Sequence, residues 1–325
     1  MNRLIKLAFP LLLVTACSAQ QSISSNYDFQ DVSFPNSFYS VPLGINNLRQ
    51  VAGTYIDATG EHGFLWDAGV FTTIDYPGGF GTSAGGINDK GEVVGLFVDA
   101  LGFQHGYKMT PNVCGDGNNG VCKSKFTPID VPGAAQTQSV PFEFGPGLGT
   151  AAVGINNYGQ VTGMYATPGL YSNGFVNVGQ TFTPIDHPLA GHGPALGTKC
   201  FSIANNGVLA CDYLVQATPT SYPMTHAFLV NGAHKVAIDC PGAAQYFFGT
   251  QISGVNIHYT AVGTCFNGYS LDAILWSDGK FYTVNVAGMP YNELHSINDR
   301  GDVTGAYDTD PSGQQLFGFV AFLKP

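Results

Sequence analysis

The sequence predicts an all-β fold, a six-bladed β-propeller built from four-stranded antiparallel blades. Three observations lead to this prediction. Short β-rich runs separated by Gly, Asp, Asn and Pro occur throughout the chain. One composite motif returns six times along it. The last copy stops one strand short, and a matching strand stands near the start of the chain.

The composition supports a β-rich globular protein and excludes several other classes. The 325 residues are 44% hydrophobic and 13% aromatic, which is enough for a large core and too apolar for a disordered chain. Only 10% of the residues are charged. The net charge is −10, so the chain lacks the basic balance that a nucleic-acid partner requires. We therefore expect no nucleic-acid partner.

The repeat begins with a string such as "GINDKGEVVG", residues 86–95. Its apolar anchors lie 42, 68, 48, 52 and 42 residues apart, and they are Ile45, Ile87, Ile155, Ile203, Val255 and Ile297. Two further strings follow each anchor, typified by "HGFLW" at 62–66 and "FTTIDYPG" at 71–78. Each copy thus contains four β-rich runs, which we call A to D. Four antiparallel strands in a period of roughly 40–45 residues are typical of one propeller blade.

The ends of the chain predict how the ring closes. The sixth copy reaches Pro325 with runs A, B and C but no run D. The segment "YDFQDVSFPN", residues 27–36, matches run D in composition and would complete the last blade as its outer strand. This closure needs no partner chain, whereas an open solenoid would expose a strand edge at each end. We therefore expect residues 27–325 to form one propeller domain that is monomeric.

The N-terminus has the features of a signal peptide over residues 1–16. Arg3 and Lys6 precede an apolar run at 7–14 that is too short to span a bilayer. The following string, Val-Thr-Ala-Cys, resembles a bacterial lipobox, in which Cys17 becomes the lipidated first residue. Cleavage after Ala19 by an ordinary signal peptidase is the alternative.

This interpretation predicts an extracytoplasmic protein. Residues 17–26 would form a linker, and a lipid anchor would be the only membrane attachment. Ser18, instead of an aspartate, follows the cysteine. In a Gram-negative cell, the resemblance to a lipobox then implies sorting to the outer membrane. With the alternative cleavage the protein would be secreted.

The remaining six cysteines can form three disulfides, as expected for an oxidising compartment. They are Cys114, Cys122, Cys200, Cys211, Cys240 and Cys265. The first two bracket a loop and are expected to pair. Cys200 and Cys211 flank one hairpin and would leave Cys240 with Cys265, although the connectivity of these four stays open. A zinc site would need paired short spacings, which are absent. We expect no metal and no cofactor, with a structural calcium ion in "CGDGNNG" as an alternative.

The pairing of "GINDxGxVVG" with "HAFLW"-like strings resembles the HAF repeats, an extracellular family named for His-Ala-Phe. The resemblance covers about residues 27–323. Copies four and five depart from the pattern, with Ala204 in place of the Asn and Ile257-His258-Tyr259 in place of the turn. The resemblance implies a secreted or surface location and no settled biochemical activity.

The recurring polar residues are expected to be structural. In the A–B turn, Asn88 would cap the turn and Gly91 would supply a positive φ. The string lacks the helix and the Lys-Ser/Thr of a phosphate loop, and the ligand spacing of a calcium loop. Histidines that open run C would bond a neighbouring strand or loop; they are His62, His105 and His226. Aspartates that end run D would accept from backbone N–H groups of the next bend; they are Asp75, Asp130, Asp186 and Asp239.

Function is expected in the long insertions, all of which reach one face of a propeller. They are residues 132–153, 187–200, 214–225 and 240–251. Clustered aromatic residues on loops over a rigid scaffold are typical of a ligand surface. The candidates are Phe142, Phe144, Tyr222, Tyr246, Phe247 and Phe248. We expect a surface-anchored module that binds a glycan, a peptide or a protein.

Two other functions remain open. An extracytoplasmic glycan hydrolase or lyase would place its site over the propeller axis, with Glu143, His187 and His192 as candidate catalytic residues. Such enzymes need two positioned carboxylates or an acid with a metal, and the insertions contain only one acid of this kind. The second alternative is a structural envelope protein.

Overall fold

The computed structural model describes residues 21–113, 123–136, 149–216, 223–243, 249–266, 270–308 and 316–325. Strands make up almost all of the regular structure in these ranges, and a single 3-10 turn covers Ser24–Asn26. Within the described residues, no helix is long and apolar enough to cross a membrane.

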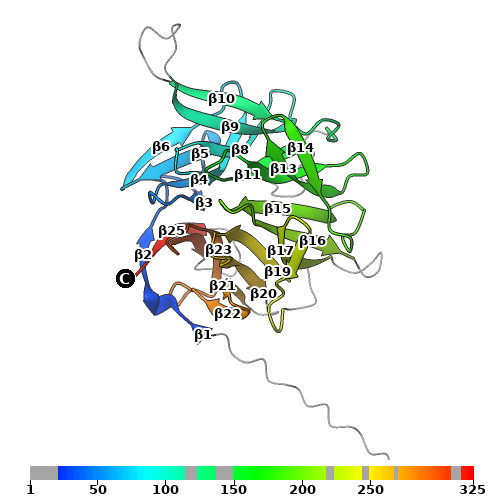
Figure 1. Ribbon diagram of the computed structural model, residues 1–325. Coiled ribbons are helices and arrows are strands. Elements are labelled where there is room, and N and C mark those ends of the chain that lie inside the picture. Colours follow the sequence, from blue (N-terminus) through cyan, green and yellow to red (C-terminus); the bar gives the residue numbers. More distant parts are fainter. Residues whose placement is uncertain are drawn as a thin grey trace, which may run out of the picture.

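The described strands pair into six successive four-stranded antiparallel blades arranged in a ring (Figure 1). Blade 1 comprises β3 (Tyr39–Ile45), β4 (Val51–Asp57), β5 (Gly60–Asp67) and β6 (Val70–Ile74). Blade 2 comprises β7 (Gly81–Ile87), β8 (Val93–Val98), β9 (Gln104–Val113) and β10 (Lys123–Ile129). Blade 3 comprises β11 (Thr150–Ile155), β12 (Val161–Ala166), β13 (Ser172–Val178) and β14 (Thr181–Ile185). Blade 4 comprises β15 (Gly197–Ile203), β16 (Leu209–Val215), β17 (Met224–Asn231) and β18 (His234–Ala237). Blade 5 comprises β19 (Thr250–Val255), β20 (Ala261–Phe266), β21 (Leu271–Ser277) and β22 (Lys280–Thr283). Blade 6 comprises β23 (Tyr291–Ile297), β24 (Val303–Asp308), β25 (Leu316–Leu323) and β2 (Tyr27–Asp31). The predicted propeller is confirmed, and runs A to D correspond to the four strands of each blade.

The N-terminal strand closes the ring as predicted. β2 pairs antiparallel with β25, from Tyr27 opposite Leu323 to Asp31 opposite Phe319, and lies beside it in Figure 1. A cross-blade ion pair supports this closure. Arg49, in the A–B turn of blade 1, contacts Asp302 of blade 6 through Nε–Oδ2 at 3.0 Å and Nη2–Oδ1 at 3.2 Å.

Part of the expected linker is ordered against the ring. β1 (Gln21–Ser22) pairs parallel with β22, the outer strand of blade 5, and the Asn285 amide donates to Ser24 Oγ at 2.9 Å. An outer strand has one unpaired edge, and a short added strand satisfies part of it. The chain therefore contacts blade 5 before it completes blade 6.

The A–B turns link the blades around the axis. Asn88 Oδ1 accepts from the amides of Lys90 and Glu92, both at 3.0 Å, and Gly91 has φ 72°. This confirms the capped turn. The Nδ2 of the same asparagine donates to the backbone oxygen of the next blade's turn, Asn156, at 3.1 Å. Equivalent bonds start from Asn46, Asn156, Asn256 and Asn298. Copy four carries Ala204 here, and the bond to blade 5 comes instead from Asn206 Nδ2, which donates to the Ile257 backbone oxygen at 2.9 Å.

The seams between blades are also joined on the outer side of the innermost strands. The amide that follows each strand D donates to a side-chain oxygen on strand A of the next blade, at 2.8–3.0 Å. The accepting residues are Ser40, Thr82, Thr150, Thr198, Thr250 and Asn292. One buried polar position per copy therefore fixes how each blade packs on its neighbour.

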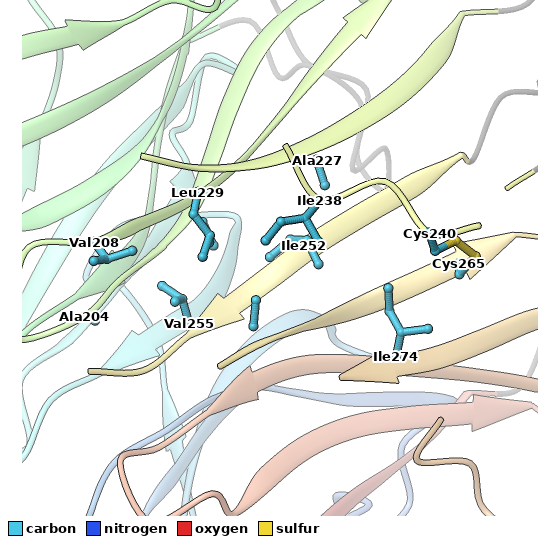
Figure 2. Packing of buried hydrophobic residues seen from close by; sticks show 12 residues of the cluster. Ala204, Val208, Ala227, Leu229, Ile238, Cys240, Ile252, Val255, Cys265 and Ile274 are labelled. Carbon is cyan, nitrogen blue, oxygen red and sulfur yellow. A yellow bond between two sulfur atoms is a disulfide. The ribbon is translucent and has the colours of Figure 1, made fainter. Parts of the chain in front are cut away.

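Apolar side chains fill the space between neighbouring blades. In the cluster between blades 4 and 5, Leu229 and Ile238 pack against Ile252 (Figure 2). The Cys240–Cys265 disulfide lies at one end of this cluster. Cys200 and Cys211, which face each other across β15 and β16, form the second disulfide. Both predicted bonds are confirmed, and they indicate an oxidising, extracytoplasmic environment. Cys17, Cys114 and Cys122 lie outside the described residues.

Candidate functional site

The ring has two faces that differ in their connections. We call the face with the B–C and D–A connections the loop face, and the face with the A–B and C–D turns the turn face. The innermost strands, β3, β7, β11, β15, β19 and β23, contact one another around the axis. Side chains from these strands and their ends therefore line both mouths of the axial channel.

The turn-face mouth is a closed polar ring. Asp89 Oδ1 accepts from the Asn47 amide at 2.8 Å, and its Oδ2 accepts from Asn157 Nδ2 at 2.6 Å. Asp299 repeats the arrangement with Ile257 N at 3.2 Å and Asn47 Nδ2 at 3.1 Å. The cavity enclosed here is about 80 Å³. Burial alone would raise the pKa of Asp89, but the bonds from Asn47 and Asn157 outweigh it and lower the pKa below its usual value. These carboxylates are satisfied by amide donors, so the ring is structural.

The loop-face mouth carries a cluster of acidic and hydroxyl groups over blades 6 and 1. Tyr39 stands at the start of β3, and burial followed by the charges of Glu293 and Glu61 raises its pKa above the usual value. Burial likewise raises the pKa of Glu61, whose Oε1 accepts from Thr54 Oγ1 at 3.3 Å. His295 Nε2 lies 3.0 Å from Glu293 Oε2. The charges of two carboxyl groups, from blades 6 and 1, thus both act on one phenol.

Two exposed phenylalanines border this cluster. Phe38 and Phe80 each stand directly before the innermost strand of their blade, and they are 66% and 76% exposed. The neighbouring Gly81 lies beside the Glu61 side chain, so the backbone that carries Phe80 is close to that carboxyl group. Large exposed apolar side chains beside polar groups are typical of ligand surfaces. We call Phe38, Tyr39, Glu61, Phe80 and Glu293 the axial mouth cluster.

The opposite side of the channel holds a second set of charged groups. Lys199 on β15 is the register partner of Asp212 on β16. Asp212 is buried, and its Oδ1 accepts from the Ile252 amide of blade 5 at 3.0 Å. Gln251, which precedes Ile252 on the innermost strand of blade 5, is half-buried. Asp212 therefore lies in the seam between blades 4 and 5.

The recurring histidines and aspartates pair with each other. His62 Nδ1 lies 2.8 Å from Asp75 Oδ1, and His226 Nδ1 lies 2.9 Å from Asp239 Oδ2. Blade 2 repeats this pair with His105 and Asp130 at 3.1 Å. Blade 5 uses Asp272 and Asn285 in exchanged order, at 3.2 Å. The expected structural role holds, but the main partner of the aspartate is the histidine of strand C instead of the backbone of the next bend.

Aromatic stacks continue from these histidines across the seams. Phe34 stacks on Tyr55 at 3.7 Å, and Tyr55 stacks on His62 at 5.1 Å between centroids. The seams after blades 1 and 3 have the same arrangement, with Tyr76–Phe97–His105 and His187–Tyr213–His226. Cys240 and Cys265 occupy the two corresponding inner positions between blades 4 and 5, as the shared register shows. This disulfide therefore takes the place of an aromatic stack.

The candidate catalytic histidines have structural contacts. His187 lies in the seam stack, and burial followed by the charge of Lys235 lowers its pKa. His192 Nε2 lies 3.3 Å from Asp186 Oδ2, and its ring stacks on Tyr171. Glu143 lies outside the described residues, so its distance to either histidine is not part of the structure. The same holds for the predicted aromatic ligand residues Phe142, Phe144, Tyr222, Tyr246, Phe247 and Phe248.

Sequence reasoning missed the axial mouth cluster, although a signal was present. The residue before strand A is Phe38 in copy one and Phe80 in copy two, both large and apolar at a position that the fold leaves exposed. In copy four the same position holds Leu196, which is buried. Among the described residues, no group of three or more His, Cys, Asp or Glu is placed to hold a metal ion.

The strand pairing and the closing strand define this chain as a β-propeller protein. No protein-family model and no curated protein matches the sequence. Solved structures similar to it include a mutant of AofleA from Arthrobotrys oligospora, 12% identical, covering 92% of this chain and 94% of that one, with a TM-score of 0.48. The propeller domain of the Trilobed protease from Pyrococcus furiosus is 8% identical, with 87% and 95% covered and a TM-score of 0.45. Aleuria aurantia lectin in complex with α-methyl-L-fucoside is 11% identical, with 94% and 98% covered and a TM-score of 0.45.

Proposed function

We propose that this propeller is an extracytoplasmic binding module that takes neutral saccharides at the axial mouth cluster. The observation that carries the proposal is the pair of exposed rings, Phe38 and Phe80, beside the half-buried Tyr39, Glu61 and Glu293. Apolar C–H faces of a sugar can pack on aromatic rings, while its hydroxyl groups donate to carboxylates. The acidic cluster and the net charge of −10 disfavour an anionic polysaccharide.

The proposed localisation follows from the N-terminus. Lipidation of Cys17 would anchor the ring to the bacterial envelope, and membership of the HAF-repeat family would agree with a surface location. Metabolic labelling with palmitate should mark the native chain and fail for Cys17→Ala. Equal labelling of both chains would remove the lipid anchor from the proposal.

Binding is tested with a neutral-glycan array followed by calorimetry on the best ligand. The double variant Phe38→Ala/Phe80→Ala should lose about 10- to 100-fold in affinity, because truncating aromatic anchors costs about 1.5–3 kcal/mol. Tyr158→Ala is the matched control, since Tyr158 is 76% exposed but belongs to an A–B turn on the turn face. Unchanged affinity in the double variant would contradict the proposal.

A second pair of variants tests whether the long loops take part. These variants are Tyr246→Ala and Phe248→Ala, which change two aromatic residues of the insertion 240–251 on the loop face. Weaker binding in these variants as well would extend the ligand surface from the mouth to the insertion 240–251. The other insertions of the same face, 132–153, 187–200 and 214–225, would then be the next candidates. Weaker binding in these variants alone would move the site away from the axial mouth cluster.

A glycan hydrolase or lyase is the second candidate function. The observation in its favour is the raised pKa of Glu61, which suits a proton donor, together with a second carboxyl group, Glu293, whose charge also acts on Tyr39. New reducing ends or unsaturated products from a bound polysaccharide, abolished by Glu61→Gln, would convert the binding module into an enzyme. A structural envelope role predicts neither binding nor turnover in these assays.

A further inference from the structure

The basic residues of the ring are gathered on the turn face. They lie in A–B turns or at the start of strand D, next to a C–D turn, and the exposed ones include Lys90, Lys123, Lys125, Lys235, Lys280 and Arg300. Others on this side form ion pairs, namely Arg49, Lys108 and Lys324. In the described part of the chain, Lys199 is the one Lys or Arg residue on the loop-face half of its strand.

The acidic residues are distributed in the opposite way. Besides the two glutamates of the axial mouth cluster, the loop face carries the aspartates that end strands B and D, such as Asp57, Asp75, Asp99, Asp130, Asp186 and Asp239. On the turn face, Asp302 is paired with Arg49, and the carboxylates of the polar ring accept from amide donors. Asp67 and Asp278 are exposed there, in C–D turns. The net charge of −10 is therefore concentrated on the loop face, and a partner that approaches the turn face meets exposed cations.

The centre of the turn face is a rim of exposed side chains. Asparagine bonds join each A–B turn to the next around the axis, so the third residues of these turns form one continuous rim. They are Leu48, Lys90, Tyr158, Asn206, His258 and Arg300, and all are exposed. Leu48 is 59% and Tyr158 76% exposed. Apolar and tyrosine side chains interleaved with Lys and Arg are typical of surfaces that lie on a bilayer.

The proposed anchor brings this rim within reach of a membrane. β1 lies at the edge of the ring beside β22, which begins at the C–D turn of blade 5 (Figure 1). Only residues 18–20 separate Cys17 from β1, and four residues span at most about 14 Å. This reach rests on the lipid anchor of the proposed function, whereas the charge and the exposed rim of the turn face do not.

We propose that the turn face is a membrane-docking surface that binds the headgroups of anionic phospholipids. Lys90 and Arg300 would donate to phosphate oxygens, while Leu48 and Tyr158 enter the boundary between headgroups and acyl chains. The same lipids repel the acidic loop face, so the axial mouth cluster is directed away from the bilayer. The sequence predicted the lipid anchor as the only membrane attachment, and docking adds a second one.

Vesicle sedimentation of an unlipidated chain tests the docking by itself. The chain is residues 17–325 with Cys17→Ser, which contains all the described residues. It should bind vesicles of phosphatidylcholine with about 30% phosphatidylglycerol at least about tenfold more tightly than vesicles of phosphatidylcholine alone, because anionic lipids attract basic residues. Equal binding to both compositions, or binding to neither, would overturn the proposal.

Lys90→Ala/Arg300→Ala removes two cations from the rim. Each basic residue near an anionic bilayer strengthens binding about fivefold, so this variant should bind about 25-fold more weakly. Ala58→Glu/Ala100→Glu is the matched control, because it changes the net charge by the same amount at exposed B–C turns of the loop face. The control should bind vesicles as the native chain does. An equal loss in both variants would make total charge the cause and would overturn the proposal.

Tryptophan reporters give the orientation of the bound ring. Tyr158→Trp should be quenched by phospholipids with brominated acyl chains, because its ring enters the bilayer boundary. Phe38→Trp, on the loop face, should not be quenched beyond the native chain, which contains Trp66 and Trp276. Quenching of Phe38→Trp in place of Tyr158→Trp would overturn the proposed orientation.

Two further outcomes identify which part of the proposal fails. Binding to dextran sulfate without binding to vesicles would assign the turn face to an anionic polymer and overturn the lipid proposal. Failed palmitate labelling of the native chain, with intact vesicle binding of the unlipidated chain, would remove the anchor and support the docking. Normal palmitate labelling without vesicle binding would retain the anchor and overturn the docking.

Discussion

Removal of Arg49 should weaken the closure of the ring more than removal of an ion pair within one blade. The Arg49 guanidinium bridges blade 1 to Asp302 of blade 6 by two hydrogen bonds and lies 4.4 Å from the centre of the Phe322 ring. Asp302 also accepts from Asn298 Nδ2 and from the Leu323 amide, both at 3.1 Å. Arg49→Ala would leave this carboxylate buried without its counter-charge.

The expected cost follows from the exposure of the two side chains. Breaking a buried pair costs about 3–5 kcal/mol, and an exposed pair is worth about 0–1 kcal/mol. The Asp302 side chain is 1% exposed and the Arg49 side chain 43% exposed. We therefore expect Arg49→Ala to lower the free energy of unfolding by about 2–3 kcal/mol, an intermediate value between these limits.

Urea unfolding followed by tryptophan fluorescence measures this cost, because Trp66 belongs to blade 1. Lys108→Ala is the control. Lys108 and Glu92 form a pair inside blade 2 with side chains 29% and 14% exposed, and its loss should cost about 1 kcal/mol. In an Asp302→Asn background, Arg49→Ala should cost less than in the native chain. A cost for Arg49→Ala no larger than that for Lys108→Ala would refute the reasoning.

Three further outcomes are expected. Gly305→Ala should destabilise the chain by about 1–3 kcal/mol, because a Cβ there would overlap the Glu293 carbonyl and the Phe319 ring, as a thermal unfolding scan would show. Cys240→Ser/Cys265→Ser should lower the free energy of unfolding in urea by about 3 kcal/mol, since the bond closes a loop with a separation of 25 residues. A smaller loss than for Cys200→Ser/Cys211→Ser, where the separation is 11 residues, would contradict loop entropy as the cause. The hydrogen bond to Asp239 raises the pKa of His226, so this pair should stabilise the fold below the unfolded pKa of about 6.5 and lose that contribution as the pH rises through the folded value. Native chain and His226→Asn, compared at pH 5 and pH 8, should differ more at pH 5, and equal differences would contradict this assignment.

The fold was predictable because its determinants repeat. Each copy restates the turn that Asn88 caps and Gly91 completes, and the missing last strand is supplied by residues 27–31. The disulfides were predictable only in part, because Cys200 and Cys211 flank a single hairpin but the sequence left the connectivity of the four cysteines open; the structure pairs Cys200 with Cys211 and Cys240 with Cys265.

The side-chain contacts were harder to predict than the strands, although the chain contains signals for some of them. His62–Asp75 and His226–Asp239 have the same separation of 13 residues, and Asp272–Asn285 keeps it with the roles exchanged. That conserved spacing within one chain indicates a contact between strands C and D. The Lys199–Asp212 pair has no counterpart in other copies, so only the three-dimensional packing shows that Asp212 is buried.

The seam between blades 4 and 5 is joined differently from the other seams of the ring. Ala204 removes the axial asparagine bond here, and Ile257 replaces the polar side chain that accepts from the preceding turn elsewhere. A covalent bond, Cys240–Cys265, stands where other seams have stacked rings. A reducing agent would therefore loosen the ring at this one described seam, where the Asn206–Ile257 and Asp212–Ile252 hydrogen bonds would remain.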